Sequence, residues 1–212
     1  EKFVLGRHSL QTAAALFELA VGGSKLDALL VTSEMRAYEI KTERDELSRL
    51  VTQLVSYRKA FRKIWVFTCD KHASSAARIL PSATGIVVLG KRYRMQTLRE
   101  AVSDSNELCC KTMLALLRRR ELLTFLQTHH QTTDIPNTHV LTAAVRYAER
   151  LNPEDVNDFV GKQLRARGLS NTSLARQLPR SLGAAALALA LTDAQSSRLI
   201  THLQMPLSEA IN

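Results

Sequence analysis

The first hundred residues alternate between two patterns of apolar and polar positions, one typical of β-strands and one typical of helices. Within Thr42–Phe61 the apolar residues are three and four positions apart, which predicts an amphipathic helix. A shorter helix is predicted over His72–Leu80. Short apolar runs predict strands at Ala14–Val21, Leu26–Val31, Arg36–Lys41, Ile64–Thr68 and Gly85–Leu89. This order of elements predicts an α/β fold, in which a mixed β-sheet is flanked by helices.

After about residue 100 the pattern becomes helical and rich in alanine and leucine. Asn152 followed by Pro153 is typical of a helix start, and this helix is expected to end near Arg167 because Gly168 follows. Further helices are predicted over Asn106–His130, Thr138–Leu151, Ser170–Arg176, Leu182–Leu191 and Asp193–Leu203. We therefore expect an α/β core over residues 1–100 and an all-helical C-terminal region over residues 101–212.

The charge balance favours a polyanionic partner. The chain has 29 Lys and Arg residues against 20 Asp and Glu residues, a formal net charge of +9 at pH 7. Such a surplus attracts nucleic acid, although an ordinary basic soluble protein would show the same composition. The three cysteines form no Cys-x-x-Cys pair, so free thiols and a cytoplasmic location are expected rather than a disulfide or zinc site. No apolar run reaches the ~18 residues of a membrane-spanning helix.

Two carboxylates and a lysine fall on neighbouring predicted strands. Asp27 lies on one strand, and Glu39 and Lys41 emerge from the same face of the next. Antiparallel pairing would bring these side chains within a few ångströms of one another. Carboxylate and carbonyl oxygens are the ligands that Mg²⁺ prefers, so Asp27, Glu39 and the Ile40 carbonyl predict a site for Mg²⁺ or Mn²⁺. Lys41 would assist a water that attacks a phosphodiester. The alternative is a solvated sheet face whose charges bind nothing.

The predicted helix that follows adds two polar residues near this site. Gln53 and Tyr57 are four positions apart, so they share one helix face, beside the stripe formed by Leu47, Leu50 and Leu54. A helix that packs back on the sheet would bring Gln53 and Tyr57 toward the carboxylates, where they would support the site. Otherwise Gln53 is an exposed helix residue and Tyr57 an aromatic at the edge of the core.

These residues carry a family resemblance. Asp27 followed by Glu39-Ile40-Lys41 on consecutive strands resembles the PD-(D/E)XK nuclease superfamily. The glutamine and tyrosine of the next helix resemble the Gln-x-x-x-Tyr motif of its recombination-exonuclease branch. The segment Tyr38–Leu50 is similar to a family of small bacterial proteins with the pattern Phe-Glu-(Ile/Leu)-Lys-Ser-Asp-Arg-Asp-Thr-Leu-x-Arg-Leu. The resemblance covers roughly residues 14–170.

This resemblance implies a restriction-endonuclease-like fold and a metal-dependent nuclease. It implies that Asp27, Glu39 and Lys41 form the catalytic set. Many relatives add an acidic residue from an upstream helix. Here Glu18 is the nearest residue of that kind, although the apolar pattern places it on a strand that pairs with the strand of Asp27.

Basic residues elsewhere are candidates for contacts with nucleic acid. Arg44 is predicted in the first turn of the long helix, from which its guanidinium could reach a phosphate. Lys91, Arg92 and Arg94 surround an aromatic residue, a combination that can hold a nucleic-acid backbone. A surface ion pair for Arg44 and a solvated loop for the cluster are the alternatives.

Taken together, these features predict hydrolysis of DNA phosphodiesters that depends on Mg²⁺ or Mn²⁺. The helical region would contact DNA, a protein partner or a second copy of the chain. Three alternatives remain open at this point. The protein could bind nucleic acid through an inactive nuclease fold, act as an interaction component of a defence or mobile-element system, or cut RNA.

Overall fold

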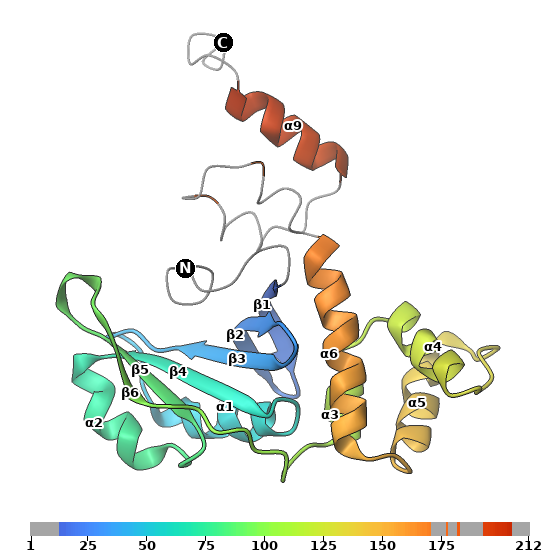
Figure 1. Cartoon of the computed structure of the whole chain (residues 1–212), viewed down its shortest axis with the longest axis horizontal. Coiled ribbons are helices and arrows are strands. Elements are labelled where there is room, and N and C mark those ends of the chain that lie inside the picture. The colour runs from blue at the N-terminus through green and yellow to red at the C-terminus, as the bar shows by residue number, and fades with distance from the viewer. Residues whose placement is uncertain (1–12, 171–176, 178–181, 183–192, 205–212) are drawn as a thin grey trace.

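The computed structural model describes residues 13–170, 177, 182 and 193–204 (Figure 1). Apart from Ser170 and Leu182, the short helices expected over Ser170–Arg176 and Leu182–Leu191 lie outside these residues. Of the described helices, none is both long enough and apolar enough to cross a membrane. All three cysteines are free thiols, as the sequence predicts.

A six-stranded mixed sheet, with its strands in chain order, confirms the predicted α/β class. Strands β1 to β3 are antiparallel, β3 to β5 are parallel, and β6 returns antiparallel to β5. The bounds are Ala14–Val21 for β1, Ser24–Val31 for β2, Met35–Ile40 for β3, Lys63–Cys69 for β4, Gly85–Leu89 for β5 and Met95–Arg99 for β6. The sequence did not predict β6, because this exposed edge strand has no buried residue to produce an apolar pattern.

The two crossover helices cover one face of the sheet (Figure 1). Helix α1 spans Ser48–Arg58 and follows β3, and helix α2 spans Asp70–Ile79 and follows β4. A parallel strand pair needs such a crossover, and the common right-handed connection places successive helices on the same side. The buried side chains of α1 belong to the large apolar cluster of the protein, whereas Tyr38, Trp65 and Val87 belong to a smaller cluster.

The helix predicted over Thr42–Phe61 spans only Ser48–Arg58. At its N-terminal side, residues 42–47 form a loop instead. Thr42 donates its backbone N–H and its hydroxyl to Asp45 Oδ2, at 2.7 and 2.6 Å. This local side-chain bonding competes with helix formation. Arg44 therefore lies in the loop before α1, and the prediction that it belongs to the first turn of the helix is wrong.

The second half of the described chain is helical, as predicted, but its divisions differ. The single helix expected over Asn106–His130 is wrong, because Glu121 accepts the Arg118 N–H at 2.6 Å and starts a new helix there. Helix α6 starts at Pro153 as predicted, with Asn152 Oδ1 accepting the Glu154 N–H. The helices are α3 (Cys110–Leu114), α4 (Arg119–Thr128), α5 (Val140–Ala148), α6 (Pro153–Ser170) and α9 (Asp193–Gln204).

Helix α6 packs against β1 and joins the helical region to the sheet (Figure 1). The large apolar cluster includes buried residues of both parts, among them Leu54 of α1 and Leu164 of α6. Gly168 does not end this helix, contrary to the sequence prediction. A Cβ atom at Gly168 would lie 2.6 Å from the Cβ of Ala14, so glycine permits the close approach of helix and strand.

Two glycines of α6 give a matched test of this packing. Gly168→Ala is expected to destabilise the protein by about 1–3 kcal/mol, because the steric overlap with Ala14 outweighs the better helix propensity of alanine. Gly161→Ala is the control, since its Cβ would meet only Met35 side-chain atoms, at 3.5 Å or more, and a neutral or stabilising effect follows. Urea denaturation measures both, and equal effects would contradict the close packing at Gly168.

Candidate active site

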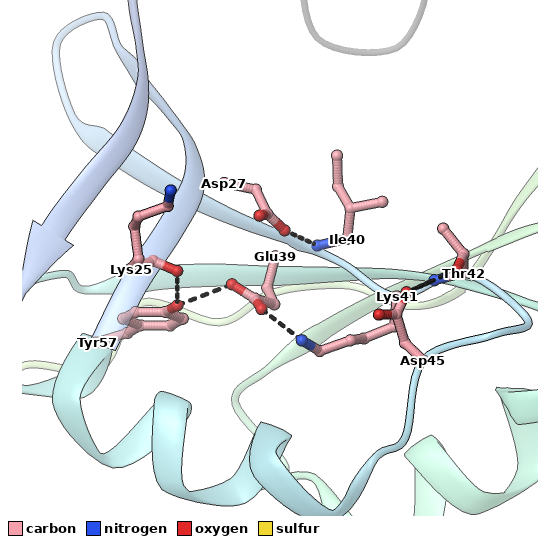
Figure 2. A network of polar contacts seen from close by, with 8 residues as sticks. All are labelled: Lys25, Asp27, Glu39, Ile40, Lys41, Thr42, Asp45 and Tyr57. Carbon is pink, nitrogen blue, oxygen red and sulfur yellow. Dashed lines mark hydrogen bonds and ion pairs between the residues drawn. The ribbon is translucent and has the colours of Figure 1, made fainter. Parts of the chain in front are cut away.

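Antiparallel pairing of β2 and β3 brings the two predicted carboxylates to the same place. Ala28 pairs with Tyr38, so Asp27 and Glu39 occupy neighbouring positions across the strands. Asp27 Oδ2 accepts the backbone N–H of Ile40 at 2.6 Å (Figure 2). The structure thus places Asp27 beside Glu39 and the Ile40 backbone, and the metal site remains a prediction.

Glu39 is the buried centre of the site, with 1% of the residue exposed. Its Oε1 accepts a hydrogen bond from Lys41 Nζ at 2.7 Å, and its Oε2 accepts one from the Tyr57 hydroxyl at 2.8 Å (Figure 2). Lys41 follows β3 directly, and its backbone N–H donates to the Phe67 carbonyl on β4 at 2.8 Å. The sheet thus fixes the backbone of Lys41, and the carboxylate fixes its ammonium group.

Tyr57 lies within the buried stripe of α1 and not beside it, which corrects the sequence prediction. Leu50, Leu54 and Tyr57 are the buried residues of this helix. The Tyr57 hydroxyl also lies 2.7 Å from the Lys25 carbonyl oxygen. Burial, together with the hydrogen bond to Glu39, raises the pKa of Tyr57, so the phenol is a neutral donor at physiological pH.

The phenol has one proton and two acceptors in reach. It donates either to the Lys25 carbonyl or to Glu39 Oε2, or it divides its proton between them. A cation on Glu39 would leave the proton of Tyr57 free for the carbonyl. The hydroxyl therefore holds Glu39 in position only while it donates its proton to Oε2.

Three buried side-chain polar atoms have no hydrogen-bond partner within the described residues. They are Gln53 Oε1, Thr68 Oγ1 and His72 Nε2. Gln53 is close enough to the site to lower the pKa of Tyr57 slightly. A buried polar atom without a partner costs ~1–3 kcal/mol, and such atoms commonly serve a water, an ion or a ligand.

Comparison with known protein families shows which family the chain belongs to. The model of a family described as "Bacteriophage P4 protein cII" matches residues 1–189. The chain belongs to this cII family. No curated protein matches the chain. The description of the cII family names no nuclease activity, so the resemblance to PD-(D/E)XK nucleases remains a prediction.

Among solved structures, the chain is similar to SfsA of Pyrococcus furiosus in complex with Ca²⁺. The two share 14% sequence identity with a TM-score of 0.29, over 49% of this chain and 59% of that one. The chain thus spans about three fifths of the SfsA structure. Similarity at this level carries no argument about the activity of the cII-family chain.

Asp27 and Glu39 of this cII-family protein supply oxygen atoms of the kind that hard divalent cations prefer. Burial, and then the charge of Glu39, raise the pKa of Asp27, and the hydrogen bond from Ile40 opposes them only in part. A cation between Asp27 and Glu39 would relieve this unfavourable proximity of negative charges. Among the described residues no group of three or more His, Cys, Asp or Glu side chains could hold a metal. Two carboxylates are nevertheless sufficient for Mg²⁺, which keeps several of its waters.

Glu18 is close to the site, but a lysine binds its carboxylate. It forms an ion pair with Lys25, and both side chains are largely exposed. Glu18 also has a positive φ of 54°, which interrupts the regular pairing of β1 with β2. Its negative charge contributes to the raised pKa of Asp27, although it is the weakest of the contributing groups.

The residues predicted to bind nucleic acid lie outside this network. Arg44 is in the loop before α1, and Lys91, Arg92 and Arg94 are in the connection from β5 to β6. Within the described residues, none of these four side chains forms an ion pair with a carboxylate.

Sequence reasoning missed Thr68 and His72. Thr68 follows Phe67, the residue whose carbonyl accepts the Lys41 N–H, and His72 is close enough to Asp45 to influence its charge. In the sequence, nothing distinguishes Thr68 from an ordinary strand residue. The parallel register of β3 and β4, which ends with Ile40 opposite Phe67, places Thr68 beside the start of the loop that contains Lys41.

Proposed function

We propose that this protein is a metal-dependent nuclease that hydrolyses phosphodiester bonds in DNA. Asp27 lies beside Glu39, which shares a buried hydrogen-bond network with Lys41, and this convergence carries the proposal because the residues come from two strands and a loop. Tyr57 joins the same network from a helix. Charges that merely solvated a sheet face would not explain a glutamate that is 1% exposed.

Asp27, Glu39 and the Ile40 carbonyl would hold Mg²⁺ or Mn²⁺. When bound, the ion supplies neutralising charge for the phosphate and lowers the pKa of a coordinated water. Ile40 contributes twice, because its N–H already fixes the orientation of Asp27. Tyr57 fixes Glu39 from the helix side, so the two carboxylates have little freedom to turn away from each other.

Lys41 would act on the attacking water and on the charge that develops in the transition state. Its ammonium group is 2.7 Å from Glu39 Oε1 and its side chain is 11% exposed, so it stays next to the carboxylates. Gln53 Oε1 is a buried acceptor without a partner, and it could accept a hydrogen bond from the same water.

DNA is the substrate class that the charge favours. A net charge of +9 attracts a polyanion, and a family described by a bacteriophage protein is consistent with a DNA substrate. A protein that binds nucleic acid without cutting it is the second candidate, since unpaired basic side chains alone would serve binding. The two candidates differ in whether a divalent cation starts cleavage.

Metal dependence tests the proposal. Supercoiled, linear duplex and single-stranded DNA, and RNA of the same sequence, would be incubated with the full chain in Mg²⁺, Mn²⁺ or EDTA and resolved on gels. DNA cleavage is expected in Mg²⁺ or Mn²⁺ and none in EDTA. Cleavage that persists in EDTA would exclude the metal role. DNA binding without cleavage under every condition would favour the second candidate, and cleavage of RNA alone would change the substrate class.

A further inference from the structure

Three parallel strands end at one edge of the sheet, and the segment after each of them carries positive charge. Strands β3, β4 and β5 run in the same direction, so their carboxyl ends lie together. Ligands of open α/β sheets bind outside such an edge. The cations that follow the three strands are Lys41 and Arg44 after β3, Lys71 after β4, and Lys91, Arg92 and Arg94 after β5. We call these six residues the carboxyl-edge track.

Contacts between the three segments make the track continuous. The Lys71 ammonium donates to the Glu43 carbonyl at 3.0 Å, which joins the start of α2 to the loop before α1. A Cβ atom at Gly90 would lie 3.4 Å from Asp70 Oδ2, so the connection after β5 packs directly against the start of α2. The track therefore begins beside Glu39 and reaches the β5–β6 connection without a gap between segments.

The cations of the track remain available to a ligand. Arg44, Lys71, Lys91, Arg92 and Arg94 are exposed, and none forms an ion pair with a carboxylate among the described residues. Elsewhere, cations such as Arg58, Arg62 and Arg167 do form such pairs. The exposed track cations would not have to break an ion pair in order to bind a phosphate.

Four carboxylates lie along the same edge and reduce its net positive charge. Glu43, Asp45 and Glu46 are in the loop before α1, and Asp70 begins α2. Two hydrogen bonds from Thr42 already engage Asp45. Because Lys41 is paired with Glu39, the positive charge available to a ligand is concentrated in the segment after β5, where Lys91, Arg92 and Arg94 have no carboxylate among them.

The β5–β6 connection has a defined backbone. Arg92 adopts φ 58° and ψ 30°, a left-handed conformation that residues other than glycine occupy rarely. The Gly90 N–H donates to the Arg94 carbonyl at 2.8 Å, and this hydrogen bond joins the two ends of the loop that contains Arg92. A loop held in this way presents Lys91, Arg92 and Arg94 in a fixed arrangement, which suits contact with a regular chain of phosphates.

We infer that the carboxyl-edge track binds the phosphate backbone of the DNA strand whose scissile phosphate lies at Asp27 and Glu39. The inference rests on the proposed function and adds the path of the substrate. Neighbouring strands are ~4.8 Å apart, so the path from β3 to β5 is ~10 Å long. Measured along the axis of a B-form duplex, where each strand has one phosphate per ~3.4 Å, this length corresponds to about three phosphates. Phosphate contacts of this kind position DNA without reading its sequence.

Binding in EDTA tests the track separately from cleavage. A fluorescent oligonucleotide of arbitrary sequence would be titrated with the full chain at several salt concentrations and followed by anisotropy. The triple variant Lys91→Gln, Arg92→Gln, Arg94→Gln is expected to bind at least ~10-fold more weakly. The slope of log K against log salt should fall by about 2–3, in proportion to the lost phosphate contacts. A second variant, Lys71→Gln, should reduce the slope by about 1.

The control variant removes the same charge from the helical region. Lys111→Gln, Arg119→Gln, Arg120→Gln changes three exposed cations of α3 and α4, which lie on the far side of the molecule from the β5–β6 connection (Figure 1). Its binding is expected to match the wild type. Equal losses in both triple variants would show that only net charge matters and would overturn the track. Thermal unfolding of each variant excludes misfolding as the cause.

The outcomes separate the track from the proposed nuclease. If the track variants lose binding but the wild type never cleaves DNA with any metal, the track stands and the nuclease proposal falls. If metal-dependent cleavage occurs while the track variants bind and cleave as the wild type does, the track is wrong and the nuclease stands. If the wild type binds no nucleic acid, both are wrong.

Discussion

Asp27→Asn is expected to reduce DNA cleavage in Mg²⁺ by at least ~100-fold, the range found when an electrostatic catalytic group is lost. Asparagine keeps the size of the side chain and an oxygen that can accept the Ile40 N–H, but it removes the negative charge that would hold the cation. Initial rates of nicking measured over a range of Mg²⁺ concentrations give the result. A shift to higher Mg²⁺ requirement would identify the loss as one of metal binding.

Two controls make the Asp27→Asn result specific. Asp134→Asn makes the same change at an exposed loop position outside the site, and cleavage should not change. Folding is followed by thermal unfolding in EDTA. Because the pKa of Asp27 is raised in the folded protein, its ionised form costs stability at neutral pH, and the neutral asparagine should unfold at the same or a higher temperature. Wild-type cleavage by Asp27→Asn would remove the site assignment.

The same variant separates an enzyme from an inactive binding protein. In EDTA, Asp27→Asn should bind DNA as the wild type does, because the track cations are unchanged. Loss of cleavage with retained binding is the pattern of a catalytic residue. Loss of both would instead indicate that Asp27 contributes to binding.

Arg167→Met is expected to destabilise the protein by about 3 kcal/mol, the largest stability effect that we expect from the ion pairs described. Arg167 on α6 binds Glu121 on α4 through two nitrogens, with Nε to Oε1 at 2.9 Å, and also donates to the Leu116 carbonyl at 3.1 Å. Both charged side chains are less than 15% exposed. Removing the guanidinium would leave the Glu121 carboxylate and a carbonyl partly buried with fewer donors.

A double-mutant cycle isolates this pair. Glu121→Gln removes the charge while a glutamine can still accept the Arg118 N–H at the start of α4. The double variant Arg167→Met, Glu121→Gln should be more stable than Arg167→Met alone, because no unpaired carboxylate remains. Arg120→Met, at an exposed position, is the control and should change stability by less than ~0.5 kcal/mol. Urea denaturation measures all four variants. Equal effects for Arg167→Met and Arg120→Met would contradict the buried pair.

Arg167 also shows a limit of sequence reasoning. Its positive charge contributes to the net charge of +9, but in the structure Arg167 forms an ion pair with Glu121. Arg44 and Lys91 have the same formal charge and stay exposed without an ion pair among the described residues. Composition counts these residues as equal, and only the packing of α4 against the end of α6 distinguishes them.

Local patterns determined much of the fold. Strands β1 to β5 and helix α2 were predictable because each buries apolar residues at its own period, and Asn152-Pro153 marked the start of α6. Local patterns failed where the deciding partner was distant in sequence. Gly168 looks like a helix end, but it is a contact with Ala14 in β1.

The sequence by itself determined the residues of the proposed site and predicted that Asp27 and Glu39 belong to neighbouring strands, since alternation along a strand is a local property. Only the tertiary structure decided their chemistry. The tertiary structure buries Glu39 between Lys41 and Tyr57. The helical spacing alone had predicted that Tyr57 lies beside the buried stripe. The physical reason is that burial and hydrogen-bond partners depend on how α1 packs against the sheet, and this packing joins residues that no short sequence pattern contains.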